Sequence, residues 1–132
     1  MEITCTVHSI TFKLGDQIKE KVKKLPHGYG VFKIYANSKD GELLYIGKAG
    51  TVATDGEFGK NDLPKRLTMK QDDVYRQDLF TQQLQDHAEY EQLYIECYYL
   101  EDNSVLPGFL RAKLMQEYFQ EHKKLPLWNK SF

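Results

Sequence analysis

Two apolar segments joined by a short polar turn constrain this chain more than any other feature. Residues 29–36 read YGVFKIYA, and residues 43–47 read LLYIG. The intervening NSKDGE contains Asp40-Gly41, a pair typical of hairpin turns, in which a positive φ angle is needed. We therefore expect an antiparallel hairpin over residues 29–47.

The rest of the chain predicts strands and helices on both sides of this hairpin. Segments rich in β-branched and aromatic residues predict strands at 2–12 and 92–100. Apolar periodicity and capping residues predict helices at 16–25 with Asp16 as the cap, from Asp62 onwards with Pro64 in the first turn, over about 73–89, and over 106–124. This order predicts an α+β fold: a small, mostly antiparallel three-stranded sheet flanked by helices, with an extra N-terminal strand and helix.

The composition is that of one globular domain: 132 residues, of which 41% are hydrophobic and 28% charged. No apolar run is long enough for a membrane span, and the N-terminus lacks the pattern of a secretory signal. Cys5 and Cys97 lie far apart in the sequence, which is typical of a reducing compartment. We expect a cytoplasmic protein without a membrane partner.

Charge is distributed unevenly along the chain, although the net charge is only −1. Segments 48–70 and 104–132 carry net charges of +2 and +3, whereas segment 71–101 carries −7. A net charge near zero gives no general attraction to nucleic acid. The two basic segments nevertheless permit a local basic surface.

The hairpin carries motifs that resemble those of the GIY-YIG nuclease superfamily. GVF at residues 30–32 and YIG at residues 45–47 stand where that family has its two paired motifs, on adjacent antiparallel strands. The run YIGKAG, the segment PKRL, the strand LYIECYYL and the terminal LPLWN follow in the family's order. The resemblance covers about residues 25–132, so residues 1–24 are expected to be an N-terminal extension within a single domain of residues 1–132.

The resemblance implies hydrolysis of nucleic-acid phosphodiesters, with DNA as the expected partner and Mg²⁺ or another divalent metal as the cofactor. In that family a strand tyrosine activates the attacking water, a helix arginine stabilises the phosphate, and a carboxylate of the last helix binds the metal. These roles suit phosphoryl transfer, which depends on positioning and on neutralising oxyanion charge. The implied catalytic residues are Tyr45, Arg66 and Asn129, and the implied phosphate-binding residues are Gly47, Lys48 and Lys70.

The first motif departs from the family, because it ends in Phe32 where the family has a tyrosine. Phenylalanine keeps the packing but has no hydroxyl to orient a water molecule. Tyr29 and Tyr35 lie at odd offsets from position 32, so a regular strand directs them to the opposite face of the sheet. Tyr45 is therefore the remaining candidate among the strand tyrosines.

The metal-binding carboxylate is the second departure, and two alignments of the last helix are open. The apolar pattern of PGFLRAKLMQEY places Arg111 at the family's glutamate position, whereas the spacing from Asn129 favours Glu117. A rotation of about 240° separates the two along a helix, so they cannot share a face. With Arg111 at the position, a cation replaces a metal ligand and ordinary metal-dependent cleavage should fail.

Two functions of different class follow from these residues. The first is a small endonuclease that acts on DNA, and Tyr45, Arg66 and Asn129 favour it. The second is a nuclease-fold protein that has lost cleavage and binds nucleic acid or a protein partner, and Phe32 and Arg111 favour it. The fold alone does not decide between the two.

Overall fold

The computed structural model of the protein describes residues 2–132 and is built around a four-stranded sheet. The strands are β1 (Cys5–Phe12), β2 (Gly30–Ala36), β3 (Leu43–Ala49) and β6 (Leu93–Leu100). They lie in the order β1-β6-β2-β3, and every neighbouring pair is antiparallel. The expected α+β class is therefore confirmed. The N-terminal strand pairs with β6 along its whole length, which makes it the fourth strand of the sheet.

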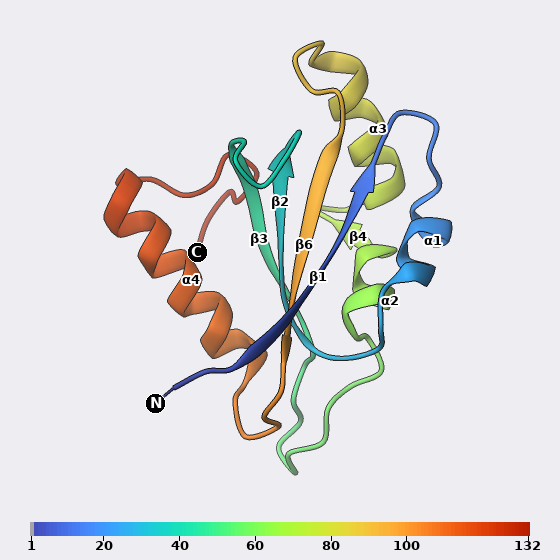
Figure 1. Cartoon of the computed structure of the whole chain (residues 1–132). Coiled ribbons are helices and arrows are strands. Elements are labelled where there is room, and N and C mark those ends of the chain that lie inside the picture. Colours follow the sequence, from blue (N-terminus) through green and yellow to red (C-terminus); the bar gives the residue numbers. More distant parts are fainter. Residues whose placement is uncertain (1) are drawn as a thin grey trace.

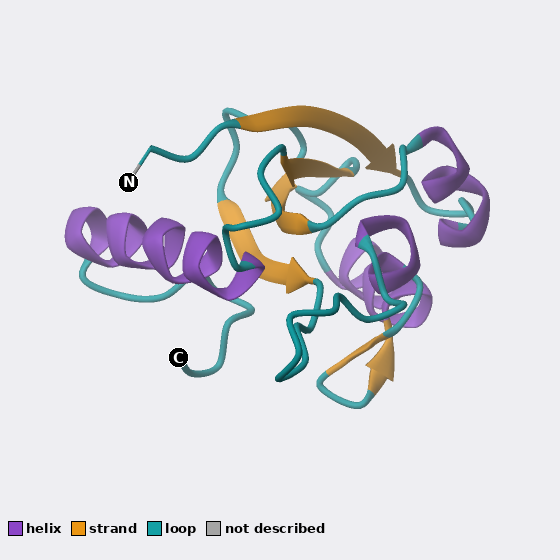
Figure 2. Cartoon of the chain, turned by 90° about the horizontal axis from the view of Figure 1, so that it is seen from below, coloured by secondary structure: helices purple, strands orange, loops and turns teal. Residues whose placement is uncertain are grey.

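Helices cover the two faces of this sheet unequally (Figures 1 and 2). On one face lie α1 (Ile18–Lys21), which continues as a 3₁₀ turn η1 (Val22–Lys24), then α2 (Leu63–Leu67) and α3 (Arg76–Asp86). On the other face lies α4 (Pro107–His122), the longest helix. No helix within residues 2–132 has the length and apolar character needed to cross a membrane.

Side chains alternate between the two faces and build a core on each. The larger core, on the side of α1 to α3, includes Phe12, Phe32, Ile34, Phe80 and Ile95. The smaller core, under α4, consists of Val31, Ile46, Leu110 and Met115. Because both faces of β2 and β3 are covered, these strands read as nearly continuous apolar runs in the sequence.

The hairpin expected over residues 29–47 is confirmed, with β2 paired to β3 and one bulge after Ile34. Its turn differs from the expectation, because the positive φ angle of 70° is at Asn37 and not at the Asp40-Gly41 pair. Gly41 is needed for another reason. A Cβ atom there would lie 1.8 Å from the carbonyl oxygen of Ala36, so the chain passes too close for a side chain.

The prediction that Asp16 caps the first helix is wrong. The helix begins at Ile18, after Gln17, and the Asp16 carboxylate instead accepts a hydrogen bond from the backbone nitrogen of Lys13 at 2.8 Å. The backbone nitrogen of Ile18 donates to Oε1 of Gln77 at 2.7 Å. A side chain that is distant in sequence thus satisfies the helix terminus in place of a local cap.

The helix expected over about 73–89 is shorter than predicted, because a small hairpin occupies its first residues. Strands β4 (Lys70–Gln71) and β5 (Val74–Tyr75) pair around Asp72 and Asp73, whose φ angles are 51° and 66°. Two successive residues with positive φ are typical of a tight two-residue hairpin turn. This hairpin places Arg76 at the first position of α3.

Candidate functional site

Tyr45 and Gly47 lie on the face of β3 that the larger core covers, opposite Ile34 and Phe32 of β2. The rings of Phe32 and Tyr45 pack with their centroids 5.8 Å apart. A Cβ atom at position 47 would lie 2.5 Å from Cζ of Phe32 and 2.7 Å from Cε2 of Tyr45. Gly47 is therefore required for the packing of these two rings, a reason that the sequence motif does not disclose.

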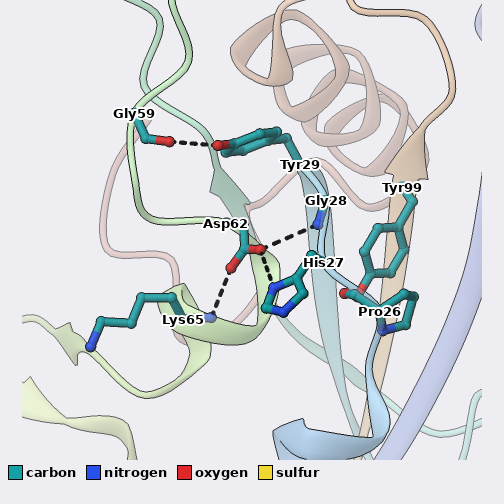
Figure 3. A network of polar contacts seen from close by, with 8 residues as sticks. All are labelled: Pro26, His27, Gly28, Tyr29, Gly59, Asp62, Lys65 and Tyr99. Carbon is teal, nitrogen blue, oxygen red and sulfur yellow. Dashed lines mark hydrogen bonds and ion pairs between the residues drawn. The ribbon is translucent and has the colours of Figure 1, made fainter.

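Asp62 anchors the helix that carries Arg66 (Figure 3). Its carboxylate accepts hydrogen bonds from the backbone nitrogens of Lys65 and Gly28, both at 3.3 Å, and lies 2.9 Å from Nδ1 of His27. The expected cap of this helix is confirmed. Because one carboxylate bonds both to the helix terminus and to the segment that enters β2, the position of α2 beside the sheet is fixed.

Two tyrosine hydroxyls tie the neighbouring segments together in the same region (Figure 3). The Tyr29 hydroxyl donates to the carbonyl oxygen of Gly59 at 2.6 Å, and the Tyr99 hydroxyl donates to the carbonyl oxygen of Pro26 at 2.7 Å. The first bond holds the glycine-rich loop that leads into α2. The second holds the chain before β2 against the central strand β6.

Arg76, which sequence reasoning did not select, is the most deeply buried charged side chain near Tyr45. Only 2% of its surface is exposed. Its Nε donates to Oε1 of Gln71 at 3.0 Å, and its Nη1 donates to the carbonyl oxygen of Arg66 at 2.6 Å. Its guanidinium carbon lies 5.0 Å from the centre of the Phe32 ring. Arg76 thus joins α3, the segment of Arg66 and the β2–β3 hairpin.

The electrostatic environment of Arg76 links it to both predicted residues. Burial lowers the pKa of Arg76 to about 10, with Tyr45 acting in the opposite direction by charge and by hydrogen bonding. The positive charge of Arg66 lowers the pKa further, and Asp72 raises it. Tyr45 and Arg66 are therefore both close to the same buried guanidinium.

Lys48 connects this group to α4. The helix passes close to it, because a Cβ atom at Gly108 would lie 3.9 Å from Cδ of Lys48. Burial lowers the pKa of Lys48, and the positive charges of Arg66 and Arg111 lower it further. Lys48, on the edge strand β3, thus lies near cations of both α2 and α4.

We call the group formed by Lys48, Arg66, Arg76 and Arg111 the cation cluster. It contains all three arginines of the chain. Among residues 2–132, the ion pairs within 4.0 Å involve other lysines and the histidines, and none includes a member of the cluster. Arg111 contacts an aromatic ring, with its guanidinium carbon 5.0 Å from the centre of the Phe132 ring. The cluster is therefore a concentration of positive charge in which no member forms an ion pair within residues 2–132, although Asp72 acts on Arg76 from beyond 4.0 Å.

The two candidates for the metal-binding position lie in different surroundings. Arg111 belongs to the cation cluster. Glu117 pairs with Lys113, whose Nζ lies 3.1 Å from its Oε2, and lines a cavity of about 560 Å³ between α4 and the β2–β3 hairpin. Its negative charge acts on Lys33, which lies on the α4 face of the sheet, whereas Tyr45 lies on the other face.

These residues do not fit a divalent metal beside Tyr45. Mg²⁺ prefers hard, anionic oxygen ligands, and the charged groups of the cluster are all cations. Within the described residues 2–132, no three histidine, cysteine, aspartate or glutamate side chains gather as metal ligands. Lys70 does not join the cluster either: it is exposed, and its Nζ lies 5.1 Å from the centre of the Tyr75 ring.

Asn129 has a clear structural partner. Its Oδ1 accepts a hydrogen bond from the backbone nitrogen of Ile46 at 2.9 Å, and its Nδ2 donates to the carbonyl oxygen of Ile46 at 3.0 Å. The backbone nitrogen of Trp128 donates to the carbonyl oxygen of Leu44 at 2.8 Å. The C-terminal tail thus provides hydrogen-bond partners for backbone groups on the free edge of β3, including those of Ile46 between Tyr45 and Gly47.

One signal in the sequence points to Arg76. It is the only basic residue other than histidine in segment 71–101, and it stands at the start of a predicted helix. A cation is unfavourable at that end of a helix, so its presence there needs an explanation. Comparison with known proteins supplies none: no protein family, curated protein or solved structure matches this chain significantly.

Proposed function

We propose that this chain is a nuclease-fold protein of the GIY-YIG type that binds nucleic-acid phosphates, those of DNA in the first place, at the cation cluster. We also propose that it does so without Mg²⁺-dependent cleavage. The observation that carries the proposal is that Arg66 acts on both Lys48 and Arg76, that Arg111 also acts on Lys48, and that none of these four cations forms an ion pair within 4.0 Å in residues 2–132. Like charges that approach one another disfavour the charged state of each, and a bound anion reverses that effect.

The chemistry of the cluster favours phosphate over other anions. Arginine offers a planar fork of donors that matches phosphate oxygens, and all the arginines of the chain are gathered here. The net charge of −1 means that attraction to nucleic acid must come from such a local surface. Tyr45 adds a hydroxyl beside the arginines, which suits a phosphate oxygen as a hydrogen-bond acceptor.

Loss of cleavage follows from the same charges. In the implied mechanism a metal ion neutralises the developing negative charge and positions the attacking water. Arg111 brings a guanidinium where the family has an anionic ligand, and like charge opposes the approach of Mg²⁺. The arginines that exclude the metal can still hold a phosphate, so binding can persist where cleavage is lost.

Binding to a short fluorescein-labelled DNA duplex, measured by anisotropy at several salt concentrations, tests the proposal. The slope of log K against log salt counts neutralised phosphates, so a cluster that converges on one or two phosphates should give about −1 to −2. Arg66→Ala and Lys48→Ala, at two half-buried positions, should each lower the affinity by about tenfold or less. Lys23→Ala, at an exposed lysine paired with Glu20, is the control and should bind normally.

Plasmid nicking separates binding from cleavage. We expect no difference between reactions with Mg²⁺ and with EDTA. Rapid nicking that requires Mg²⁺ and disappears in Glu117→Ala would show a working nuclease and would overturn the proposal.

A protein partner is the alternative function. It is favoured by exposed apolar side chains on α4 and the tail, namely Leu106, Phe109, Phe119, Leu127 and Phe132. Contiguous exposed apolar surface is typical of protein interaction sites. Undetectable DNA binding at low salt would favour this alternative over the nucleic-acid role.

A further inference from the structure

The donors of Arg76 are only partly used within the protein. Gln71 accepts from Nε, and the carbonyl oxygens of Arg66 and Met69 accept from Nη1, the latter at 3.4 Å. Within residues 2–132, Nη2 donates no hydrogen bond to another residue. Every fully buried side-chain nitrogen and oxygen described there has a partner, so Nη2 must keep contact with the surface.

The residues around the Arg76 guanidinium show which groups lie near Nη2. The guanidinium carbon lies 5.0 Å from the centre of the Phe32 ring, and the Tyr45 ring packs beside Phe32 with the two ring centroids 5.8 Å apart. Arg66 lies close enough for its charge to act on Arg76 and its carbonyl oxygen to accept from Nη1. Tyr45 and Arg66 therefore both lie close to the guanidinium that carries the unused Nη2 donor.

The negative charge of Asp72 acts on Arg76 only from beyond ion-pair distance. The hydrogen-bond acceptors of Arg76 are a neutral amide and two backbone carbonyls, and no carboxylate lies within 4.0 Å among residues 2–132. Removing a charge from water is unfavourable unless the charge is paired. The N-terminus of α3 adds further positive potential at this residue. A guanidinium held in this way is prepared to bind an anion from outside.

We infer that Arg76 is an anion-binding residue: Nη2, the Tyr45 hydroxyl and the Arg66 guanidinium form a seat for one tetrahedral oxyanion, the phosphate group of a nucleic-acid backbone. The inference rests on the proposed function, and adds to it a buried residue that the sequence motifs did not assign. It also gives a role to the departure at position 32. A phenylalanine offers its ring face to the guanidinium, whereas a tyrosine hydroxyl in this fully buried position would need a partner of its own.

The test observes Arg76 directly by NMR of the guanidinium nitrogens in the ¹⁵N-labelled protein. With three arginines in the chain, the signals are assigned from Arg66→Lys and Arg111→Lys variants. Sodium phosphate is titrated first, against sodium chloride of equal ionic strength, and the DNA duplex is titrated second. We expect the Arg76 signals to shift saturably with phosphate and with DNA, and to respond little to chloride.

Two variants extend the test. Tyr45→Phe removes one hydroxyl and keeps the bonds of Arg76 to Gln71 and to the carbonyl oxygens of Arg66 and Met69. Phosphate affinity should therefore fall by about threefold to tenfold while the fold is kept. Arg76→Lys keeps the charge but removes the forked donor, and affinity should fall by about tenfold or more in the folded protein. Backbone ¹H–¹⁵N spectra check that each variant is folded.

The outcomes separate the two proposals. If DNA and phosphate shift Arg66 but leave Arg76 unchanged, the seat is wrong and the nucleic-acid role stands. If phosphate shifts Arg76 but the DNA duplex does not bind at low salt, the seat stands and the nucleic-acid role is wrong. If neither ligand moves any arginine signal, both proposals are wrong.

Discussion

The contact between Asn129 and Ile46 allows a quantitative prediction. Ile46 lies on an edge strand, so its backbone groups on the outer side have no neighbouring strand, and the Asn129 amide takes the place of one. Both groups are buried. Asn129→Ala leaves a donor and an acceptor without partners, each at a cost of about 1–3 kcal/mol. Since water can reach part of the vacated space, we expect the free energy of unfolding to fall by about 2–4 kcal/mol.

The expected change in melting temperature follows from the size of the chain. An unfolding entropy of about 2.1 cal/mol/K per residue, over 132 residues, converts this loss into roughly 7–14 °C. Denaturant unfolding gives the free energy, and calorimetry gives the melting temperature. Lys130→Ala is the matched control, because this exposed neighbour makes only a surface ion pair, 3.9 Å from Asp72.

The same variant tests whether Asn129 has a role beyond structure. With both polar groups of its amide bonded to β3, the folded variant should bind DNA within about twofold of the unmodified affinity. Asn129→Asp should be destabilised as well, because a carboxylate oxygen would face the carbonyl oxygen of Ile46. A stability loss below about 0.5 kcal/mol in Asn129→Ala would refute the reasoning, since that is the scale of an ordinary surface substitution.

Three further predictions concern the charges and the anchoring of the site. Arg111→Glu should introduce Mg²⁺-dependent plasmid nicking, because it restores an anionic ligand. Arg111→Gln is the control, and equal nicking by both variants would contradict the metal argument. Burial raises the pKa of Cys97 from 9.0 to about 12, so the folded protein keeps a proton that the unfolded chain loses. The contribution of Cys97 to the free energy of unfolding should therefore be fully present below pH 9 and be lost as the pH rises towards 12. In denaturant titrations, Cys97→Ala should make the decrease of this free energy with pH shallower by about 1.4 kcal/mol per pH unit. An unchanged slope in the variant would contradict this reasoning. Asp62→Ala should lower the free energy of unfolding by about 1–2 kcal/mol and weaken DNA binding, because α2 and Arg66 lose their anchor, whereas Asp62→Asn should keep most of both. Equal losses in the two variants would mean that the negative charge, and not the cap, is what matters.

Local patterns were sufficient for much of the fold. The β2–β3 hairpin, β6, α4 and the Asp62 cap were all predicted, because alternation, helical periodicity and capping involve residues a few positions apart. The failures at Asp16 and at residues 73–75 have the same origin. A helix terminus satisfied by Gln77, and a turn built from two aspartates with positive φ, leave no simple periodic pattern.

The candidate site was only partly predictable. The motif around Tyr45, Lys48 and Arg66 selects residues that the structure places beside one buried guanidinium and the edge of the sheet. Of the two alignments of the last helix, the apolar pattern favoured Arg111 over Glu117. They differ in space because one side chain of α4 faces Lys48 and the other faces the cavity beside Lys33.

From the sequence alone we could predict the order of the longer strands and helices, and we could see that position 32 has no tyrosine hydroxyl and that the chain has only three arginines. Tertiary structure decided which of these residues meet. Arg76 is buried because α3 packs its first residue against Phe32, and Asn129 is engaged because the tail returns to Ile46 from 83 residues away. Burial, desolvation and charge coupling depend on which distant segments pack together, and a linear pattern specifies only the near neighbours of each residue.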